Sequence, residues 1–380
     1  MKIVLSGVET NNKGAELMLY AILQEIERQF PDAKVYLPFF RIKQGLGYVK
    51  TELDFRYTPY SKCVYKYHLR GILSRLHIPQ KYFWNTDIVN DADWFIDGSG
   101  FLFSDQWNIK DQGICMWQYK LKMLHQRGCK IVFLPQAFGP AELPNTKKIF
   151  TVLSSYADII IPRENVSFNY LKKSGVVDMR KVKQYSDFTS LAKGVFPVRY
   201  KYLKNGVCII PNMRMIDKGA ISYDDYIKLI SSIIEESRNS GHLVYLLNHE
   251  GPKDAELCYK IKESIGDGIY VVTDLNALEV KGVIASAYLV ITSRFHGLAS
   301  ALNSCVPSLA TSWSHKYEEL FRDYNITDSV LPLDDFNKAK KKVRQLLDNE
   351  TNTQIRENLQ IQVSKIKEQT REMWNEIWNL

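Results

Sequence analysis

Short, mainly apolar runs recur along the whole chain, and most are separated by segments in which apolar residues follow helical spacing. Such runs between polar turns are typical of strands that are buried on both faces. Because strands that alternate with helices favour parallel sheets, the pattern predicts an α/β fold. In the first half of the chain the runs lie at 3–5, 34–37, 94–96, 131–134 and 159–161. In the second half they lie at 207–210, 243–247, 270–272, 289–291 and 308–310.

The division of these runs into two sets predicts two doubly wound domains. A chain of 380 residues is also too long for one ordinary hydrophobic core. We expect a first domain at 1–195, a second at 200–350 and a boundary near 195–205. The tail at 353–380 has an amphipathic pattern, so we expect a C-terminal helix that packs back on the first domain. Its apolar positions are Ile355, Leu359, Val363, Ile366, Met373 and Trp374.

Composition favours a globular protein over one that spans a membrane. Hydrophobic residues make up 45% of the chain. No apolar run approaches the roughly 18 residues needed to cross a bilayer, and the first residues lack the long apolar region of a signal peptide. We therefore expect a cytoplasmic protein.

Cysteine spacing and total charge narrow the function only slightly. The six cysteines form no Cys-x-x-Cys pair and no spacing typical of a metal site, so we expect buried free thiols and no bound metal. The formal net charge of +8 is compatible with anionic substrates, anionic lipid head groups or nucleic acid. The distribution of charge along the chain separates these partners better than the total does.

The segment 55–84 has the sharpest local charge bias. It holds six Lys or Arg and eight aromatic residues, without one Asp or Glu. This mixture suits a membrane surface, where each cation near anionic lipid contributes about 1 kcal/mol, and it would make the protein peripheral on the inner face of the cell membrane. The same pattern could bind single-stranded nucleic acid, but no nucleic-acid-binding fold accompanies it, so we expect no such partner. A solvated helical hairpin is the structural alternative.

The stretch 293–316 gathers two cations and two imidazoles around one predicted strand, helix and strand. Arg294 and His296 follow the strand at 288–292, and strand alternation would place them on the same side. The end of the next predicted strand, 307–311, brings His315 and Lys316 to the same rim. Ligands of open α/β sheets bind at the carboxyl ends of strands, where helix N-termini offer donors to anions. The cluster predicts a site for an anionic substrate that needs a proton donor.

Two glycine-containing turns elsewhere could also receive a ligand. The loop at 7–14 and the turn Asp97-Gly-Ser-Gly100 each follow a predicted strand. Their backbone amides could bind a phosphate or a sugar hydroxyl. Neither turn has a Walker or Gly-x-Gly-x-x-Gly pattern, and a plain tight turn would need the same glycines.

Several short motifs occur in a fixed order along the chain. Ser-Arg-Phe-His-Gly at 293–297 is followed by Val-Pro and then by Trp-Ser-His-Lys-Tyr-Glu-Glu-Leu. The earlier motifs are Asn12-Lys-Gly-Ala-Glu-Leu-Met18, Asp97-Gly-Ser-Gly100, Pro135-Gln-Ala-Phe-Gly-Pro140 and Asp158-Ile-Ile-Ile-Pro-Arg163. With these motifs the chain resembles the polysaccharide pyruvyl transferase family over nearly its entire length.

The resemblance implies both a fold and a reaction. Members of that family resemble GT-B glycosyltransferases, in which two Rossmann-like domains face a central cleft. They move pyruvate from phosphoenolpyruvate onto a sugar as a cyclic ketal and release phosphate, in the assembly of capsule, exopolysaccharide or cell-wall glycans. The implied partners are phosphoenolpyruvate and a saccharide acceptor, free or lipid-linked, and no cofactor is expected beside this donor.

The chemistry of phosphoenolpyruvate and the family resemblance together indicate which residues bind this donor and which one protonates it. Phosphoenolpyruvate carries a carboxylate and a phosphate, so its site needs fixed cations, preferably the planar fork of arginine. Arg163, Arg294 and Lys316 match family positions associated with the donor. By the same resemblance His296 is the general acid that protonates the methylene carbon, a role that suits the ordinary pKa of histidine.

Further polar residues are weaker candidates for the cleft. Residues at the ends of predicted second-domain strands are Asn212, Arg214 and His249, the last followed by Glu250. Acceptor contacts should come from the first domain, where the candidates are Asn12, Glu16 and Asp97.

Two other functions fit the sequence. A nucleotide-sugar glycosyltransferase of similar shape would need a base and ribose pocket in the second domain, and Glu318 or Glu319 could supply its acidic ribose contact. A glycan-binding or scaffold protein without activity would tolerate the loss of Arg294 and His296.

Overall fold

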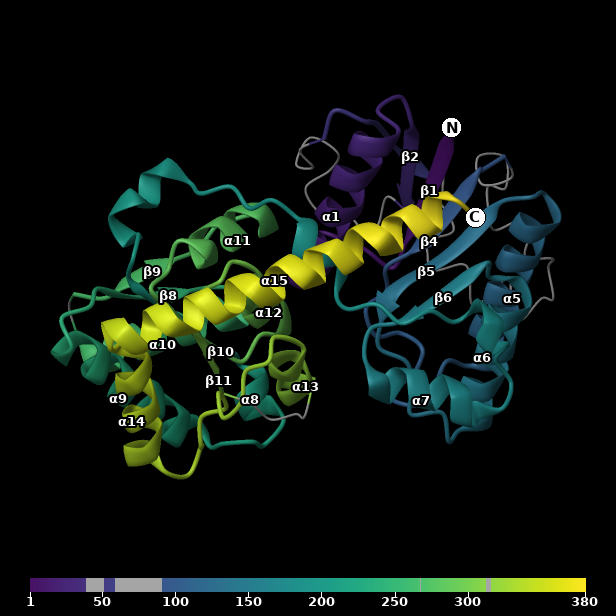
Figure 1. Cartoon of the computed structure of the whole chain (residues 1–380). Helices are drawn as coiled ribbons and strands as arrows, with labels where there is room; N and C mark the ends of the chain where they lie inside the picture. The colour runs from purple at the N-terminus through teal and green to yellow at the C-terminus, as the bar shows by residue number, and fades with distance from the viewer. Residues whose placement is uncertain (39–50, 59–90, 267, 312–315) are drawn as a thin grey trace. The chain divides into compact units, whose positions relative to one another are not determined.

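The computed structural model describes residues 1–38, 51–58, 91–266, 268–311 and 316–380. The chain forms two compact units (Figure 1). Unit 1 consists of Met1–Asn11, Met18–Phe188 and Thr370–Leu380, and unit 2 consists of Asn12–Leu17 and Thr189–Gln369. The chain therefore enters unit 2 after Phe188, earlier than the segment 195–205 that the sequence favoured.

Unit 1 is built on a six-stranded parallel sheet with the order β3-β2-β1-β4-β5-β6. The chain runs outward from β1 to β3 and then returns to place β4 beside β1. The winding direction therefore reverses between β1 and β4, which is where open α/β sheets offer a crevice. The strands are β1 (Lys2–Ser6), β2 (Lys34–Pro38), β3 (Asp54–Thr58), β4 (Trp94–Asp97), β5 (Lys130–Gln136) and β6 (Ile159–Pro162).

Helices cover both faces of this sheet. Phe95, Phe133 and Ile160 form one buried cluster with residues of α5, α6 and α7. Trp94, which alternation turns to the opposite face, packs edge-on against Trp378 of α15 with ring centroids 5.0 Å apart. The helical segments of this part of the chain are α1 (Lys13–Gln29), α5 (Asp111–Gln126), α6 (Pro144–Tyr156), α7 (Asn165–Ser174) and η4 (Met179–Lys181).

The end of helix α15 (Asn349–Trp378) belongs to unit 1. Trp378 contacts Phe30 at 5.1 Å between ring centroids and donates from its indole nitrogen to Glu25 at 3.0 Å. Trp374, which is buried, stacks on Trp378. The predicted C-terminal helix that packs back on the first domain is therefore confirmed.

Unit 2 contains a five-stranded parallel sheet with the order β11-β10-β7-β8-β9. Here the winding reverses between β7 and β10. The strands are β7 (Val207–Ile210), β8 (Val244–Leu247), β9 (Tyr270–Val272), β10 (Leu289–Thr292) and β11 (Ser308–Ala310). The helices are η5 (Phe188–Leu191), η6 (Val198–Leu203), α8 (Arg214–Asp217), α9 (Tyr223–Asn239), α10 (Gly251–Ile265), α11 (Ala277–Ala285), α12 (Phe295–Asn303), α13 (Lys316–Asp323) and α14 (Phe336–Leu347).

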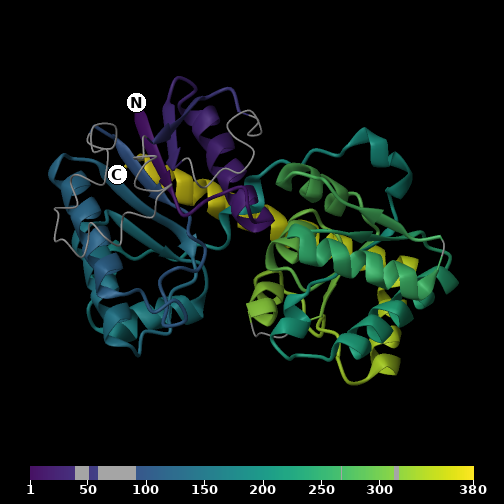
Figure 2. The ribbon, with the colours of Figure 1, turned by 180° about the vertical axis from the view of Figure 1, so that it is seen from behind.

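The core of unit 2 lies on both faces of its sheet, as the uninterrupted apolar strands predict (Figures 1 and 2). Val207 and Ile209 of β7 join a buried cluster with α9, α10 and α14. Cys208 and Ile210, on the other face of the same strand, join a cluster with α11 and α12. Both units are therefore doubly wound parallel α/β layers, and the predicted fold class is confirmed.

One strand was not predicted. Residues Asp54–Thr58 form β3, which pairs in parallel with β2 at the edge of the first sheet. Residues 55–58 are therefore not part of a helical hairpin, the structural alternative that the sequence left open for 55–84. The remainder of that basic, aromatic segment, 59–84, lies outside the described residues.

The thiols differ in exposure more than the sequence suggested. Cys129, Cys208 and Cys258 are buried, but Cys115 is exposed and Cys305 is half-buried, so the prediction of buried thiols was wrong for these two. All five are free, and Cys63 lies outside the described part of the chain. Burial raises the pKa of the Cys208 thiol to about 12, which makes it inert as a nucleophile near neutral pH.

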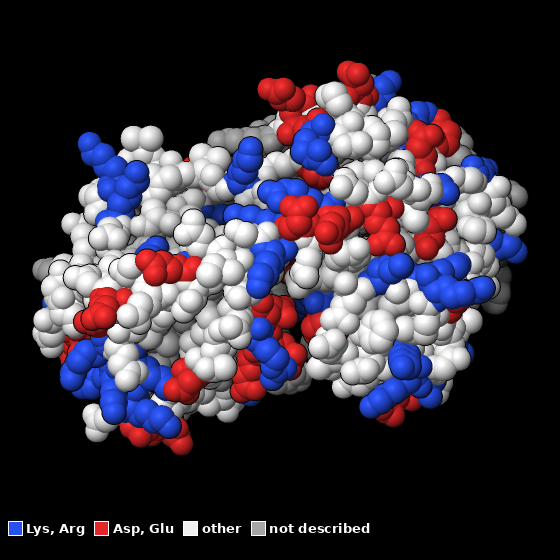
Figure 3. All heavy atoms as spheres, viewed as in Figure 1, with Lys and Arg blue, Asp and Glu red and all other residues white. Residues whose placement is uncertain are grey.

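Figure 3 shows Lys and Arg side chains interspersed with Asp and Glu on the surface in view. Among the described residues, none of the helices combines the length and the apolar character that crossing a bilayer requires.

The segment 189–195, with which the longer part of unit 2 begins, is hydrogen-bonded to α11. These contacts explain why the unit begins before residue 195. The buried Lys281 donates to the carbonyl of Thr189 at 3.0 Å, and the amide of Val195 donates to Leu278 at 2.9 Å. At Gly282 the two backbones approach so closely that a Cβ atom would overlap the carbonyl of Val195. The loop has no periodic apolar pattern, so the sequence did not reveal this attachment.

We expect Gly282→Ala to lower the free energy of unfolding by about 1–3 kcal/mol, because the added methyl group must displace backbone. Gly113→Ala is the matched control, since Gly113 is also helical and its Cβ would meet only the Cγ2 atom of Ile109, at 2.9 Å. The control should change stability by less than about 1 kcal/mol. Chemical denaturation of both variants tests this, and equal stabilities would show that the close approach at Gly282 is unimportant.

Candidate functional site

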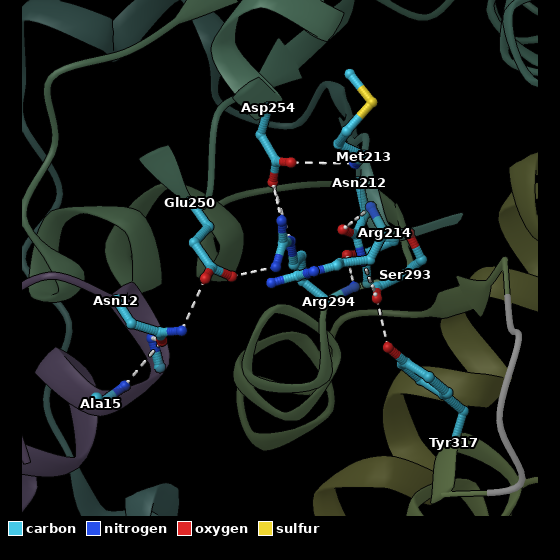
Figure 4. Close-up of polar contacts among 12 residues, drawn as sticks. Asn12, Ala15, Asn212, Met213, Arg214, Glu250, Asp254, Ser293, Arg294 and Tyr317 are labelled. Carbon is cyan, nitrogen blue, oxygen red and sulfur yellow. Dashed lines mark hydrogen bonds and ion pairs between the residues drawn. The ribbon is translucent and has the colours of Figure 1, made fainter. Parts of the chain in front are cut away.

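Polar side chains gather at the carboxyl edge of the second sheet, where β7, β8 and β10 end. Asn212 follows β7, Glu250 follows β8 and Arg294 follows β10. Figure 4 shows these residues in one connected hydrogen-bonded group. They lie around the point between β7 and β10 at which the winding reverses, so the topology of unit 2 brings them together.

Arg294 is held in place by a buried acid. Its Nε and Nη2 atoms donate to Oδ2 of Asp254 at 2.9 and 2.5 Å, and its Nη1 atom donates to Glu250. The side chain of Arg294 is 13% exposed and that of Asp254 only 1%. Asp254 is itself fixed by the amide of Met213, which donates to its Oδ1 atom at 3.0 Å.

The backbone at Arg294 differs from the strand geometry that the sequence suggested. Strand β10 ends at Thr292, whose hydroxyl accepts a hydrogen bond from the amide of Arg294 at 3.0 Å. Helix α12 begins at Phe295, so Arg294 caps its N-terminus and His296 lies in its first turn. The expectation that strand alternation sets the directions of Arg294 and His296 was therefore wrong.

Asn212 joins the two strands at the reversal. Its Nδ2 atom donates to the carbonyl of Ser293 at 2.8 Å, and its Oδ1 atom accepts from the amide of Arg214 at 2.9 Å. Tyr317 donates its hydroxyl proton to the same Ser293 carbonyl. Because Asn212 is buried and its side chain is engaged on both sides, it holds the site together rather than facing a ligand. Arg214 is exposed at the start of α8.

His249 is buried beneath this group, with 5% of its surface exposed. Its Nδ1 atom has no hydrogen-bond partner among the residues that the structure describes. Burial lowers the pKa of His249 well below its ordinary value, and the nearby charges of Arg294, His296 and Lys13 lower it further. The imidazole is therefore neutral near pH 7, and the charged groups that act on it are cationic.

His296 packs against the first turn of α1. A Cβ atom on Gly14 would overlap the Nδ1 atom of His296, so a glycine at that position makes room for the ring. His296 is half-buried and lies edge-on to Phe295, with ring centroids 5.3 Å apart. The motif that begins at Asn12 thus meets the motif around Arg294 within unit 2.

The three acceptor candidates occupy different places. Asn12 caps α1, because its Oδ1 atom accepts from the amides of Gly14 and Ala15, and its Nδ2 atom donates to Glu250 at 2.8 Å. Glu16 is buried and forms an ion pair with Lys13 at 2.6 Å. Both belong to unit 2, not to the first domain where the sequence placed them.

Asp97, the third acceptor candidate, lies in unit 1 at the end of β4. It is buried, and it accepts from the amide and hydroxyl of Ser99 at 3.1 and 3.0 Å and from Gln136 at 3.3 Å. The turn that follows it sits directly against Gly7, as a Cβ on Gly7 would overlap Ser99. The glycines at 7 and 98–100 therefore serve the packing of two loops at the reversal point of unit 1.

The remaining donor candidates are Arg163 and Lys316. Arg163 follows β6 in unit 1, is 13% exposed on its side chain and lies 3.3 Å from Glu164. Lys316 begins helix α13, and its side chain is not among the described ones. His315 lies outside the described residues.

Comparison with protein families identifies the chain. The model of the polysaccharide pyruvyl transferase family matches residues 12–315. The chain belongs to this family. The match covers the segment at Asn12 and the segment around Arg294, the two parts that meet in unit 2. None of the curated proteins matches the sequence.

Solved structures with a similar fold are distant in sequence. UDP-GlcNAc 2-epimerase from Neisseria meningitidis, bound to UDP-GlcNAc, has a TM-score of 0.62 and 9% identity over 100% of both chains. The 2-epimerase from Methanocaldococcus jannaschii has a TM-score of 0.58 and 10% identity over 92% of this chain and 94% of that one. WaaG, a glycosyltransferase involved in lipopolysaccharide biosynthesis, has a TM-score of 0.53 and 11% identity over 99% of both. At this identity the likeness shows a GT-B-like fold for this pyruvyl transferase family member.

The partners of Arg294 were largely missed. Glu250 was named with His249 as a candidate for lining the cleft but not as a partner of Arg294, and Asp254 was not considered. Their spacing of four residues at the start of a helix was a usable signal, because acidic residues stabilise helix N-termini and residues four apart share one face. Nothing in the sequence links that face to Arg294, which lies 40 residues beyond Asp254.

Replacing Asp254 by Asn should lower stability. The side chain of Arg294 is 13% exposed, and two of its nitrogen atoms would lose the carboxylate that accepts their hydrogen bonds. We expect the free energy of unfolding of Asp254→Asn at pH 7 to fall by about 1–3 kcal/mol, because a largely buried cation loses its buried partner. Denaturation with Glu256→Gln, an exposed change on the same helix, as control measures this. Unchanged stability would mean that Arg294 does not need Asp254 as its partner.

His249 should make stability depend on pH. Its pKa is depressed in the folded state, so below about pH 6.5 the unfolded chain binds a proton that the folded chain does not. Above pH 6.5 we expect His249 to have no effect on how the free energy of unfolding changes with pH. Between pH 6.5 and pH 5 that free energy should fall by about 1–2 kcal/mol, because the unfolded chain binds the proton. Denaturation at several pH values checks this, with His249→Gln giving a flatter profile and the exposed His125→Gln leaving the slope unchanged. An NMR titration in which His249 protonates near pH 6.5 in the folded protein would contradict it.

Proposed function

We propose that this family member transfers the pyruvate moiety of phosphoenolpyruvate onto a sugar as a cyclic ketal and releases phosphate. The observation that carries the proposal is the fixed guanidinium of Arg294 at the reversal point of unit 2, one helical residue from His296. An oriented arginine beside a half-buried imidazole meets two needs of this reaction, which are a receptor for an anion and a proton donor.

The electrostatics of unit 2 support an anionic donor. Helix α12 directs its N-terminus at the site. Burial lowers the pKa of His249, and the charges of Arg294, His296 and Lys13 lower it further. A positive helix terminus and nearby cations stabilise carboxylates and phosphates. In the proposed site Arg294 binds the donor directly, and Asp254 fixes the direction of the guanidinium.

The proposed chemistry uses His296 as the general acid. The imidazolium gives its proton to the methylene carbon of phosphoenolpyruvate, and one sugar hydroxyl attacks the adjoining carbon, which becomes cationic. Phosphate leaves, and a second hydroxyl closes the ketal. The two hydroxyls lose two protons, of which one restores His296 and the other leaves with phosphate or solvent. Holding donor and acid in fixed geometry supplies much of the acceleration.

The roles of the other donor candidates are also proposals. Arg163 and Lys316 would bind the second anionic group of the donor, on the strength of the family resemblance. The acceptor is proposed to be a precursor of a capsule or exopolysaccharide chain, free or lipid-linked. Contact with a membrane through 55–84 remains a hypothesis about a segment that the structure describes only at 55–58.

Two substitutions should separate binding from chemistry. Arg294→Lys removes the planar fork, so we expect phosphoenolpyruvate to bind about 10–100-fold more weakly in calorimetric titrations. His296→Asn should leave that affinity nearly unchanged but lower phosphate release, measured with a panel of sugar diols, by about 10²–10⁴-fold.

The same titrations include a nucleoside diphosphate. Binding of phosphoenolpyruvate alone agrees with the proposal. Binding of the nucleotide alone would contradict it and favour glycosyl transfer. Full activity of both variants would favour a protein in which the site is not catalytic. Glu256→Gln, which is exposed on α10, is the control that should behave as the unmodified protein.

A further inference from the structure

The carboxylate of Glu250 is bound as a ligand would be. Its Oε1 atom accepts a hydrogen bond from Nδ2 of Asn12 at 2.8 Å, and its Oε2 atom accepts one from Nη1 of Arg294. Two donors from distant parts of the chain thus receive the two oxygens of one carboxylate (Figure 4). This spacing of donors forms a receptor that fits a planar carboxylate.

The two acids that contact Arg294 are held differently. Asp254 is 1% exposed, and a backbone amide fixes its second oxygen. Glu250 is 28% exposed, and within the described part of the chain only the side chains of Asn12 and Arg294 hold its carboxylate. Asp254 is therefore a permanent partner, whereas Glu250 can leave by rotating its side chain towards solvent.

Three helix N-termini meet at this receptor. Asn12 caps α1, Glu250 precedes the first turn of α10, and Arg294 precedes the first turn of α12. Within the described ranges of the chain, the cap residues of α10 and α12 make no side-chain cap hydrogen bond. A helix N-terminus carries a partial positive charge, so the convergence of three termini favours an anion whichever group provides it.

A buried neighbour provides an independent indication of a ligand. His249 is 5% exposed and adjoins Glu250 in the chain, and its Nδ1 atom has no partner among the described residues. Buried polar atoms are normally paired, so an orphaned one beside an anion receptor indicates a partner that binds there. The positive charges that lower the pKa of His249 are those of the same site.

We propose that Asn12 and Arg294 bind the carboxylate of the anionic donor, and that Glu250 occupies this position until the donor displaces it. This inference rests on the proposed function and assigns one group of the donor to one pair of residues. It places the phosphate elsewhere, and it makes Asn12 a donor-binding residue instead of an acceptor contact. Glu250 then competes with the donor and weakens its binding without taking part in the chemistry.

The test uses two small probes with the full-length protein. Pyruvate carries the carboxylate without the phosphate, and inorganic phosphate carries the reverse. Each is titrated by calorimetry into the unmodified protein, Glu250→Gln, Asn12→Ala and the exposed control Glu256→Gln. Glu250→Gln keeps the size of the side chain but turns an amide N–H₂ towards one of the two donors, so it should be displaced more easily.

We expect Glu250→Gln to bind pyruvate about three- to tenfold more tightly than the unmodified protein, which corresponds to the modest free energy of a partly exposed ion pair. Asn12→Ala should bind pyruvate more weakly by a similar factor. Neither change should alter the affinity for phosphate, and the control should match the unmodified protein. In turnover, Glu250→Gln should lower the KM for phosphoenolpyruvate at nearly constant kcat.

Three outcomes would overturn the inference. If Glu250→Gln tightens phosphate binding instead of pyruvate binding, the receptor takes the phosphate. If it affects neither probe, Glu250 is a structural partner of Arg294. If it abolishes kcat, Glu250 takes part in the chemistry. Failure of the proposed function is distinguishable, because pyruvate could then still bind at this position while phosphoenolpyruvate yields no ketal with any sugar.

Discussion

The contact between Arg294 and Asp254 fixes the chemical centre of unit 2. It joins the residue that caps α12, just after β10, to the first turn of the helix that follows β8, near the point where the winding of the sheet reverses. Burial raises the pKa of Asp254 although the attraction of Arg294 acts to lower it, and a buried ion pair is in general weak evidence for a stabilising contact. A pair of this kind is better explained by orientation than by stability, since it sets the direction of a guanidinium that would otherwise sample several rotamers.

The rest of the site follows from that constraint. With two of its nitrogen atoms bound to Asp254, Arg294 has Nη1 left to point outwards, and this nitrogen meets Glu250. Asn212, which follows β7, donates a hydrogen bond to the carbonyl of Ser293. The backbone next to Arg294 is therefore fixed as well. Precise placement of catalytic groups depends on such supporting contacts. Most contacts of the polar network therefore hold one cation, Arg294. Of its two acidic partners, Glu250 is the more exposed one, which we propose to be displaced by the donor.

The sequence predicted the fold well because buried parallel strands are nearly continuous apolar runs. Strands such as β7 and β10 appear in the sequence as Val-Cys-Ile-Ile and Leu-Val-Ile-Thr, short runs rich in β-branched residues that favour a strand. The edge strand β3, Asp-Phe-Arg-Tyr-Thr, was missed because it is not a continuous apolar run, although the alternation of its polar and aromatic residues is a strand signal. The sequence also located Arg294 and His296 at a strand end. It could not show that Arg294 caps a helix, since a boundary shift of two residues changes side-chain direction completely.

What the sequence could not provide is the pairing of distant polar residues. Asn12 and Glu250 are 238 positions apart, and neither is unusual in its local segment. Asn12 was assigned to the first domain because its loop follows β1, yet the beginning of α1 belongs to unit 2. One helix thus begins in one unit and continues in the other. No local sequence pattern could therefore show that Asn12 and Arg294 hold the two oxygens of one carboxylate.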